Sequence, residues 1–508
     1  MAGIETAKSI KDAWDLRVQL SPEKTFVIYN DKSFSYEEVD NLAAQCAYLL
    51  QSTGLRRGDI VALQFESDID DVVYILACIK LGAIINPINP HFDSTEIQNL
   101  ISDFKPFLIV AQKAPRGRDT IYNDELAEYD SKKVGELKYY YRSDHASTID
   151  FPADPADQPA VILNTSGTTG APKGVVLTNE NVLSAELAYN QAFKITDNDM
   201  IAMPSGFYHA IGFHHGIVST ILAGSTMVIM RHYRASYLAE IIKKYPVTYI
   251  DSVPTVIYDV LFNIDDLGHL RQLIVGGDKL KQSLLDQARK RRLPVYNCYG
   301  LTEAVPFAYT PADAFAKSDY TETGVIPVKG VAIRLIDIKG KEITQPGQKG
   351  TIEVKGKIIF KEYLHRPEKT RASFDGEWLN TGDYGHYSAD HLLEIDGRNS
   401  DKIIRGGENI SAKVVEEKVK ECQNIADAAV MGYPDDRLGQ RIGAFIVLKD
   451  KGQKMNKDLL LANLSENDVD KKLWPEIIWI MDALPKTANG KTKKYLLKEK
   501  MLESIGNE

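Results

Sequence analysis

The feature that most constrains the fold is an alternation of short apolar segments with amphipathic helical segments in the N-terminal part of the chain. Strand-like runs occupy 60–65, 106–110, 227–230, 248–253 and 273–275. Helical patterns occupy 71–81 and the residues that follow 178. Continuous apolar runs are typical of parallel strands that are buried on both faces, with helices covering those faces. The alternation therefore predicts mainly parallel sheets covered by helices.

One early helix has recognisable signals at both ends. Ser35 and Glu38 have the spacing of a capping box, and an amphipathic pattern follows them as far as Gly54. We therefore expect a helix between these points, directly before the strand over 60–65.

The length indicates more than one domain. At 508 residues the chain is too long for one core, because single cores rarely exceed about 250–300 residues. Strand-like segments punctuated by Pro and Gly over 323–395 predict a more antiparallel region. After 397–401 the pattern becomes that of a small α+β domain, with a helix over 412–422 and strands over 426–431 and 442–449.

The whole pattern predicts an α/β fold with a large N-terminal domain and a small C-terminal one. We place the N-terminal domain at 1–397, a hinge at 398–401 and the C-terminal domain at 402–508. The N-terminal domain is expected to hold two helix-covered, mainly parallel sheets and a smaller β region.

Composition and charge argue against some classes of function. Hydrophobic residues make up 44% and charged residues 26% of the chain, as in globular proteins. The net charge of -9, with both signs interspersed, argues against a general nucleic-acid surface. We therefore interpret the KYYYR run at 138–142 as an edge strand rather than a nucleic-acid patch.

Cysteine usage and hydropathy indicate a cytoplasmic protein. The cysteines are Cys46, Cys78, Cys298 and Cys422. They lie far apart and form no CxxC pair, so their spacing indicates neither a disulfide framework nor a zinc site. The start of the chain lacks a signal-peptide core, and the apolar windows 72–85 and 217–230 are shorter than the roughly 20 residues of a membrane helix. We expect buried core segments there and no membrane span.

The segment 165–174, TSGTTGAPKG, has the composition of a phosphate-binding loop and follows the apolar run 160–163. Glycines let backbone N–H groups approach an anion, hydroxyls add donors, and a lysine adds positive charge. The residues that we predict to hold phosphate are Thr165, Ser166, Gly167, Thr168, Thr169, Gly170 and Lys173.

This segment differs from the Walker A loop, in which a lysine follows glycine and precedes Ser or Thr. Here Lys173 follows Pro172 and precedes Gly174. Pro172 favours extended geometry at the residue before it, so we expect the loop to join two strands, the second over 175–177. An ordinary polar turn is the alternative interpretation.

Further motifs follow in a fixed order along most of the chain. After 165–174 come 299–303 (YGLTE), 378–383 (WLNTGD), 397–410 with GR and GGENI, and 485–491 (PKTANGK). In this order they resemble the acyl-adenylate-forming enzymes, which include acyl-CoA synthetases, aryl-CoA ligases, peptide-synthetase adenylation domains and firefly luciferase. The resemblance implies attack of a carboxylate on the α-phosphorus of ATP, and a large N-terminal part with a small mobile C-terminal lid.

The resemblance also assigns roles on the nucleotide side. Glu303 is implied to bind Mg²⁺, Thr302 to contact the α-phosphate and Tyr299 to face the adenine. Asp383 is implied to bind the ribose hydroxyls, and Arg398 the ribose or phosphates. Without the motifs, Glu303 would be a solvated acid, Asp383 a turn or helix cap, and Arg398 a salt bridge at the domain junction. The other residues assigned to cofactor binding are Gly276, Gly277, Asp278, Asn297, Gly300, Gly406 and Gly407.

Lys491 is implied to be the main catalytic residue, because the matching lysine of the family contacts carboxylate and α-phosphate oxygens. A solvated basic tail is the alternative. Thiol transfer is implied to require rotation of the small domain, which brings the Gly406-Gly407 turn to a pantetheine tunnel. Where the family usually places Asp or Lys as the hinge, this chain has Ser400 followed by Asp401, and either can serve.

The acyl site is implied to follow 207–213, where His209 would shape the carboxylate end; a core histidine is the alternative. Its other expected lining residues are Val275, Gly277, Asn297 and Val305. The stretch lacks the aspartate with which amino-acid-activating domains pair an α-ammonium group. A fatty or aromatic acid is therefore expected.

The expected function is that of an acid–CoA ligase, with ATP, Mg²⁺ and coenzyme A as cofactors. The alternative is a stand-alone adenylating enzyme that loads a carrier-protein phosphopantetheine. A regulatory protein that holds nucleotide without turnover is a third reading, and the presence of Lys491, Glu303 and Asp383 argues against it. We expect either a monomer or a homodimer.

Overall fold

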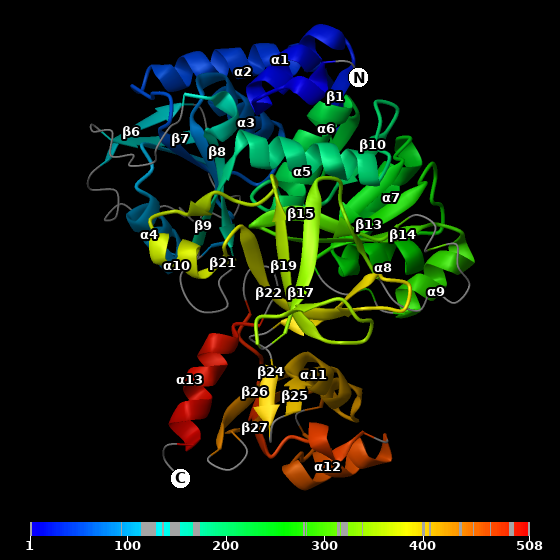
Figure 1. Ribbon diagram of the computed structural model, residues 1–508. Coiled ribbons are helices and arrows are strands. Elements are labelled where there is room, and N and C mark those ends of the chain that lie inside the picture. The colour runs from blue at the N-terminus through cyan, green and yellow to red at the C-terminus, as the bar shows by residue number, and fades with distance from the viewer. Residues whose placement is uncertain are drawn as a thin grey trace.

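The computed structural model describes residues 3–92, 94–112, 129–134, 137–142, 153–165, 173–277, 280, 282–311, 315, 324–337, 339–398, 402–405, 408–435, 439–450, 452–467, 469–486 and 492–505. Figure 1 shows a large N-terminal part above a smaller C-terminal part. This is the α/β fold with two unequal parts that the sequence predicts.

A nine-stranded sheet runs through one side of the large part. In spatial order its strands are β16 (Ile326–Pro327), β15 (Ala304–Tyr309), β14 (Val295–Leu301), β13 (Gln272–Gly276), β12 (Tyr249–Ser252), β10 (Met200–Met203), β11 (Thr226–Ile229), β1 (Thr25–Tyr29) and β2 (Lys32–Ser35). The strands from β14 to β1 pair in parallel, and the strands at both edges pair antiparallel. Continuous apolar runs thus became parallel strands buried on both faces, as expected.

An eight-stranded sheet forms the other side. Its order is β20 (Glu362–Tyr363), β9 (Lys173–Thr178), β8 (Pro159–Thr165), β4 (Ile84–Pro87), β3 (Ile60–Gln64), β5 (Leu108–Gln112), β7 (Leu137–Arg142) and β6 (Tyr129–Val134). The KYYYR run lies in β7, which pairs with β5 on one side and β6 on the other. The prediction of an edge strand there was wrong, because β6 covers that edge.

Helices lie between and outside the two large sheets. The helices α1 (Ile10–Leu20), α2 (Tyr36–Gln51), α3 (Ile69–Leu81), α5 (Asn179–Ala192), the π-helix η4 (Ile211–Val218) and α6 (Ser219–Ala223) contribute to one core that both sheets share. The outer face of the eight-stranded sheet packs on α4 (Ser94–Phe104). The outer face of the nine-stranded sheet packs on α7 (Ala235–Lys244), α8 (Pro254–Phe262) and α9 (Gln282–Arg291).

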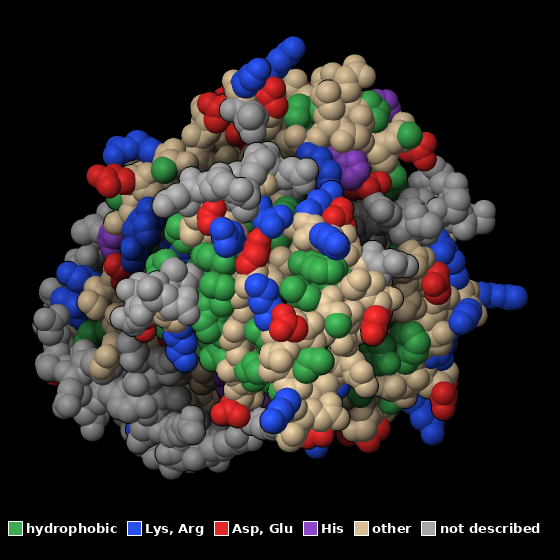
Figure 2. Space-filling model, turned by 90° about the horizontal axis from the view of Figure 1, so that it is seen from below, with side chains coloured by type: hydrophobic (Ala, Val, Ile, Leu, Met, Phe, Trp, Pro, Cys, Tyr) green, Lys and Arg blue, Asp and Glu red, His purple; other side chains and the backbone are tan. Residues whose placement is uncertain are grey.

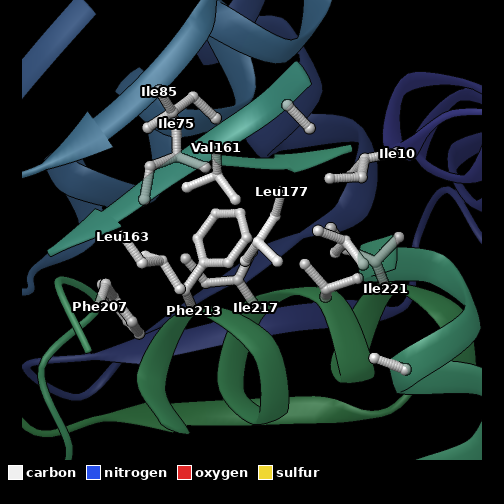
Figure 3. Packing of buried hydrophobic residues seen from close by; sticks show 14 of the residues in the cluster. Ile10, Ile75, Ile85, Val161, Leu163, Leu177, Phe207, Phe213, Ile217 and Ile221 are labelled. Carbon is white, nitrogen blue, oxygen red and sulfur yellow. The ribbon is translucent and has the colours of Figure 1, made fainter. Parts of the chain in front are cut away.

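The π-helix η4 directs two of its large apolar side chains to the eight-stranded sheet. Phe213 and Ile217 point toward Leu163 and Leu177 of β8 and β9 (Figure 3). All four side chains are at most 1% exposed. Gly216 lies on the opposite side, where an added Cβ would be 3.3 Å from the side chain of Met203 in the nine-stranded sheet. The helix is therefore held between both sheets.

The rest of the large part is antiparallel, as the punctuated sequence predicts. A six-stranded sheet consists of β17 (Val331–Ile336), β18 (Glu342–Ile343), β19 (Gly350–Gly356), β21 (Phe374–Asp375), β22 (Trp378–Tyr387) and β23 (Leu393–Arg398). The short helix α10 (Pro367–Ala372) precedes β21, and the 3₁₀ turns η1 (Ile4–Thr6) and η3 (Pro155–Asp157) lie earlier in the chain.

The smaller part has its own sheet and its own cores. Its strands are β24 (Lys402–Arg405), β25 (Glu408–Ser411), β26 (Ile425–Asp435), β27 (Gly439–Leu448) and β28 (Ile477–Met481), and its helices are α11 (Ala412–Glu421), α12 (Lys457–Glu466), the 3₁₀ turn η6 (Lys471–Leu473) and α13 (Lys494–Ile505). Buried side chains from these elements form two clusters that contain only residues of this part.

The capping box predicted at the start of α2 is confirmed. The Ser35 hydroxyl accepts the Glu38 N–H at 3.1 Å, and the Glu38 carboxylate accepts the Ser35 N–H at 2.7 Å, so the capping box forms. Among the described residues, no helix has the length and apolar character needed to cross a membrane. On the face seen in Figure 2, acidic and basic side chains are interspersed over the coloured surface.

Candidate functional site

A hydrogen bond from one large sheet to the other positions Glu303. Leu301 pairs with Ala304, which leaves Thr302 and Glu303 as the turn between β14 and β15. The Tyr363 hydroxyl donates to Glu303 Oε1 at 2.7 Å. Because Tyr363 lies on β20 of the eight-stranded sheet, this bond fixes the turn of one sheet against the edge of the other.

Lys173 approaches the same tyrosine from β9. Lys173 pairs with Thr165 across the β8–β9 hairpin. The Thr165 hydroxyl donates a hydrogen bond to the Lys173 carbonyl at 3.5 Å. The Lys173 ammonium lies 4.3 Å from the centre of the Tyr363 ring, within the range of a cation–π contact. The prediction that this segment joins two strands is confirmed, and Lys173, the first residue of the second strand, lies beside Tyr363.

The surroundings of Lys173 are rich in positive charge. Burial lowers the pKa of Lys173, and the cations Lys369, Arg366 and Arg398 lower it further. Glu303 is the negative group that opposes them. An excess of cations around a partly buried lysine favours an anionic ligand, because an anion would relieve their mutual repulsion.

Asp383 is a buried carboxylate held on both sides. Its Oδ2 accepts the Tyr299 hydroxyl at 2.6 Å, and its Oδ1 lies 2.9 Å from Arg398 Nε. Asp383 and Arg398 are cross-strand partners in β22 and β23. Arg398 thus forms a salt bridge, which was the alternative to a role in binding the nucleotide. Its partner is Asp383, which is itself predicted to bind the ribose.

Tyr299 stays a neutral donor at this position. Burial, followed by the charge of Asp383, raises the pKa of Tyr299 well above its ordinary value. Arg398 also acts on the pKa of Tyr363, as it does on that of Lys173. The Tyr299–Asp383 pair and the Glu303–Lys173 group therefore share one electrostatic environment.

Three of the predicted glycines lie toward the ends of β13 and β14. Gly277 has φ +87°, a conformation that favours glycine. Gly276 ends β13, beside Cys298 of β14. Gly300 lies where an added Cβ would be 3.1 Å from the Ala304 carbonyl. These glycines lie toward the carboxyl ends of adjacent parallel strands, where ligands of open α/β sheets bind.

Asn297 and His209 occupy different parts of this edge. Asn297 is 7% exposed, and its backbone exchanges hydrogen bonds with Thr310. His209 is half-buried in the turn before η4, and its carbonyl accepts the Phe213 N–H at 2.9 Å. Its ring lies 4.5 Å from that of Tyr208.

One part of the expected acyl site needs correction. Val275 packs in the outer core with α8 and α9, on the opposite side of the sheet from η4. The parallel register pairs Val275 with Asn297. Its two neighbours lie on the other face of the sheet: Ile274 belongs to the shared core, and Gly276 faces the Ile211 side chain of η4. Val305 is buried in β15 at 7% exposure.

Several predicted residues lie outside the described part of the chain. They are Ser166, Gly167, Thr168, Thr169, Gly170, Asp278, Ser400, Asp401, Gly406, Gly407 and Lys491. Sequence reasoning missed Tyr363, which contacts both Glu303 and Lys173. No motif marks it, and it lies 60 residues from Glu303 along the chain. Only the pairing of β20 with β9 brings it to the site.

Comparisons with known proteins identify relatives over almost the whole chain. The family model described as AMP-binding enzyme matches residues 14–364, and that of the AMP-binding enzyme C-terminal domain matches residues 414–491. A medium-chain fatty-acid–CoA ligase of Escherichia coli strain K12 is 29% identical over 98% of this chain and 91% of its own. A 2-succinylbenzoate–CoA ligase of Bacillus pumilus strain SAFR-032 is 29% identical over 95% of this chain and 96% of its own. The solved structure of O-succinylbenzoate coenzyme A synthetase from Bacillus subtilis in complex with AMP has a TM-score of 0.80 and 25% identity, covering 96% of this chain and 98% of its own.

Proposed function

Because this chain belongs to the AMP-binding enzyme family, we propose that it is an AMP-forming acid–CoA ligase. In the first step a carboxylate oxygen would attack the α-phosphorus of ATP, and the bond to pyrophosphate would break to give acyl-AMP. In the second step the thiol of coenzyme A would attack the acyl carbon and expel AMP. The observation that carries this proposal is the pair of preformed groups, Tyr299–Asp383–Arg398 and Glu303–Tyr363–Lys173, at one edge of the two sheets.

The first group suits the nucleoside. A buried carboxylate already fixed by a phenol and a guanidinium can accept hydrogen bonds from two ribose hydroxyls without reorganising. We assign this role to Asp383, with Tyr299 facing the adenine and Arg398 at the ribose or phosphates. Gly276 and Gly277, with Asp278, would leave space for the base, beside Asn297 and Gly300.

The second group suits the triphosphate. Lys173 and Thr165 flank the mouth of the loop that carries Ser166, Gly167, Thr168, Thr169 and Gly170, and Thr302 is next to Glu303. Glu303 provides the hard oxygen ligand that Mg²⁺ prefers, close to the cations that the phosphates need. Bound there, Mg²⁺ would neutralise charge on the phosphate oxygens.

The small domain would act in both steps. We assign Lys491 to charge stabilisation during adenylation, and the Gly406-Gly407 turn to the pantetheine path, with a hinge in 398–401 dividing domains at 1–397 and 402–508. The loading of a carrier protein finds no support among relatives that are named as CoA ligases. We propose a fatty or aromatic acid as the substrate, with His209 near its carboxylate.

The test is formation of acyl-CoA from a panel of fatty, aryl and amino acids with Mg-ATP, each with and without coenzyme A. One acid should release AMP and pyrophosphate in equal amounts and yield its CoA thioester by mass spectrometry. Acid-dependent pyrophosphate exchange that coenzyme A leaves unchanged would contradict the proposed acceptor. ADP as the product would contradict the adenylation step itself.

A further inference from the structure

Three buried side chains of metal-ligand type meet in the core that both large sheets share. His215 comes from η4, Asp251 from β12 and Cys298 from β14. One ligand atom of each lies within 4.8 Å of the other two. Their exposed fractions are 2%, 0% and 6%. The strand order β14-β13-β12 and the position of η4 bring together residues that no sequence spacing connects.

The ring of His215 is already oriented as a ligand. Its Nδ1 lies 3.1 Å from Glu186 Oε2, and its ring stacks on that of Tyr189 with centroids 4.0 Å apart. These contacts leave Nε2 directed at Cys298 Sγ, 4.0 Å away. A carboxylate on the second ring nitrogen is the usual way in which proteins orient a metal-bound histidine.

Asp251 has one oxygen occupied and one without a partner. Its Oδ2 accepts the Tyr189 hydroxyl at 2.7 Å. Its Oδ1 is fully buried and has no hydrogen-bond partner. Burying a carboxylate oxygen unpaired is costly, and a bound cation would remove that cost. The unpaired oxygen belongs to the same cluster as His215 and Cys298.

We infer that His215, Asp251 and Cys298 bind one zinc ion. A set of imidazole nitrogen, thiolate sulfur and carboxylate oxygen suits zinc, whereas Mg²⁺ and Ca²⁺ prefer oxygen ligands alone. In a tetrahedral zinc site the sulfur and nitrogen ligands lie about 3.6 Å apart. The 4.0 Å between Cys298 Sγ and His215 Nε2 is close to this spacing and needs only a small contraction.

This site is separate from the Mg²⁺ ligand proposed above and does not depend on the proposed reaction. It would join η4 to β12 and β14, next to the stretch 207–213. Three protein ligands leave one coordination position for water or another donor. The competing account is a hydrogen-bonded cluster that binds no metal.

The structure offers two matched controls. His214 Nδ1 lies 3.2 Å from Glu186 Oε1, so this histidine shares the same carboxylate, yet it is not one of the three clustered ligands. Cys78 on α3 is a thiol with 0% exposure outside the cluster. The variants His214→Gln and Cys78→Ser should therefore keep the metal.

The experiment measures zinc by mass spectrometry in the full chain, produced without a polyhistidine tag and dialysed against metal-free buffer. About one zinc ion per chain is expected, with loss of most of it in His215→Gln, Asp251→Asn and Cys298→Ser. Zinc that stays equal in Cys298→Ser and Cys78→Ser would be bound elsewhere and would overturn the site. A native chain that takes up no zinc even on reconstitution would overturn it as well.

A second measurement uses only the native chain, in case a ligand variant fails to fold. X-ray absorption at the zinc edge should show one sulfur at about 2.3 Å, with nitrogen and oxygen completing the shell. Replacement by Co²⁺ in the native chain should add a thiolate charge-transfer band in the near ultraviolet. A shell without sulfur would contradict the assignment.

Discussion

At the scale of residues, the nucleotide side of the site consists of side chains that hold one another in place. Asp383 is fixed by Tyr299 and Arg398, and Glu303 is fixed by Tyr363. Groups that are already oriented lose little freedom when a ligand binds. Each supporting bond should therefore affect affinity more than it affects the chemical step.

Tyr299→Phe tests whether the hydrogen bond that supports Asp383 affects affinity more than the chemical step. The variant loses the hydroxyl that donates to Asp383 Oδ2 at 2.6 Å but keeps the ring. A lost hydrogen bond to a charged group should raise the KM for ATP by about tenfold, which corresponds to about 1.4 kcal/mol, with a smaller change in kcat. Acid-dependent AMP release at varied ATP measures it. Tyr296→Phe on the same strand is the control, and equal effects of both variants would contradict the role.

Lys491→Ala separates the two half-reactions. Removal of one electrostatic contact to the transferring group should slow acid-dependent pyrophosphate exchange by about 10²–10³-fold. Thiolysis of supplied acyl-AMP by coenzyme A should stay nearly unchanged. The matched variant is Lys493→Ala, because Lys493 is a nearby lysine whose ammonium lies 3.8 Å from Glu96. Equal loss of both half-reactions in Lys491→Ala would contradict the assigned role.

The sequence predicted residues that carry a motif and missed those joined only by the fold. Tyr299, Asp383 and Arg398 were expected together at the nucleotide, and they are in contact. Tyr363 and the His215 cluster were not expected, because their partners lie on other strands and no spacing encodes the contact. Cysteine spacing alone could not point to the zinc site proposed above for the same reason.

At the scale of elements, one carboxylate ties together the amino ends of three neighbouring parallel strands. Asp199 directly precedes β10 and accepts the Thr248 hydroxyl before β12 at 2.7 Å. It also lies 2.9 Å from Nε of Arg271, which precedes β13. This junction lies at the end of the sheet opposite to Gly276, the last residue of β13.

The stability of this junction should depend on pH. Burial acts to raise the pKa of Asp199, but hydrogen bonds from Arg271, Thr248 and Thr196 outweigh it and hold that pKa below the ordinary value. The ionised carboxylate therefore stabilises the folded state above about pH 4, and this stabilisation is lost as the pH falls through the lowered pKa.

Asp199→Asn should cost about 1–3 kcal/mol of unfolding free energy at neutral pH. The difference in unfolding free energy between this variant and the native chain should shrink below about pH 4. Urea unfolding at several pH values measures this. Asp197→Asn, at an exposed neighbouring position, is the control. A difference that stays constant through acid pH would contradict the ionic origin.

Element type was more predictable than element boundary. The buried strands were expected from their apolar runs, and β13 (Gln272–Gly276) extends one residue beyond the expected 273–275 at each end. The π-helix η4 was not expected, because Gly212 and Gly216 interrupt its helical pattern. The structure explains Gly212: an added Cβ would lie 2.2 Å from the Gly206 carbonyl.

At the scale of the whole molecule, the two parts have separate cores. The buried clusters of the C-terminal part contain no residue of the large part. Lys493 and Glu96 on α4 form an ion pair between the parts, and both side chains are about a quarter exposed at most. One ion pair does not replace an apolar core, so each part should be stable mainly through its own core.

The fragment 402–508 should therefore fold alone. A domain of about 100 residues should unfold cooperatively with an enthalpy of about 60–80 kcal/mol, measured by calorimetry together with dispersed amide resonances. Val430→Asp, at a position with 0% exposure, should abolish folding, and Leu459→Asp, at 44% exposure, should not. A fragment that stays unfolded under native conditions would contradict the separation of the cores.

The position of β1 has a consequence for how the chain is made. Val27 pairs with Met227 in the nine-stranded sheet, so 200 residues separate the first strand from its parallel neighbour (227 minus 27). During synthesis that apolar strand leaves the ribosome long before β11 exists. At a typical rate of about 5–20 residues per second it waits for about 10–40 seconds. The nascent chain must therefore protect the apolar strand β1 from aggregation until β11 has been synthesised.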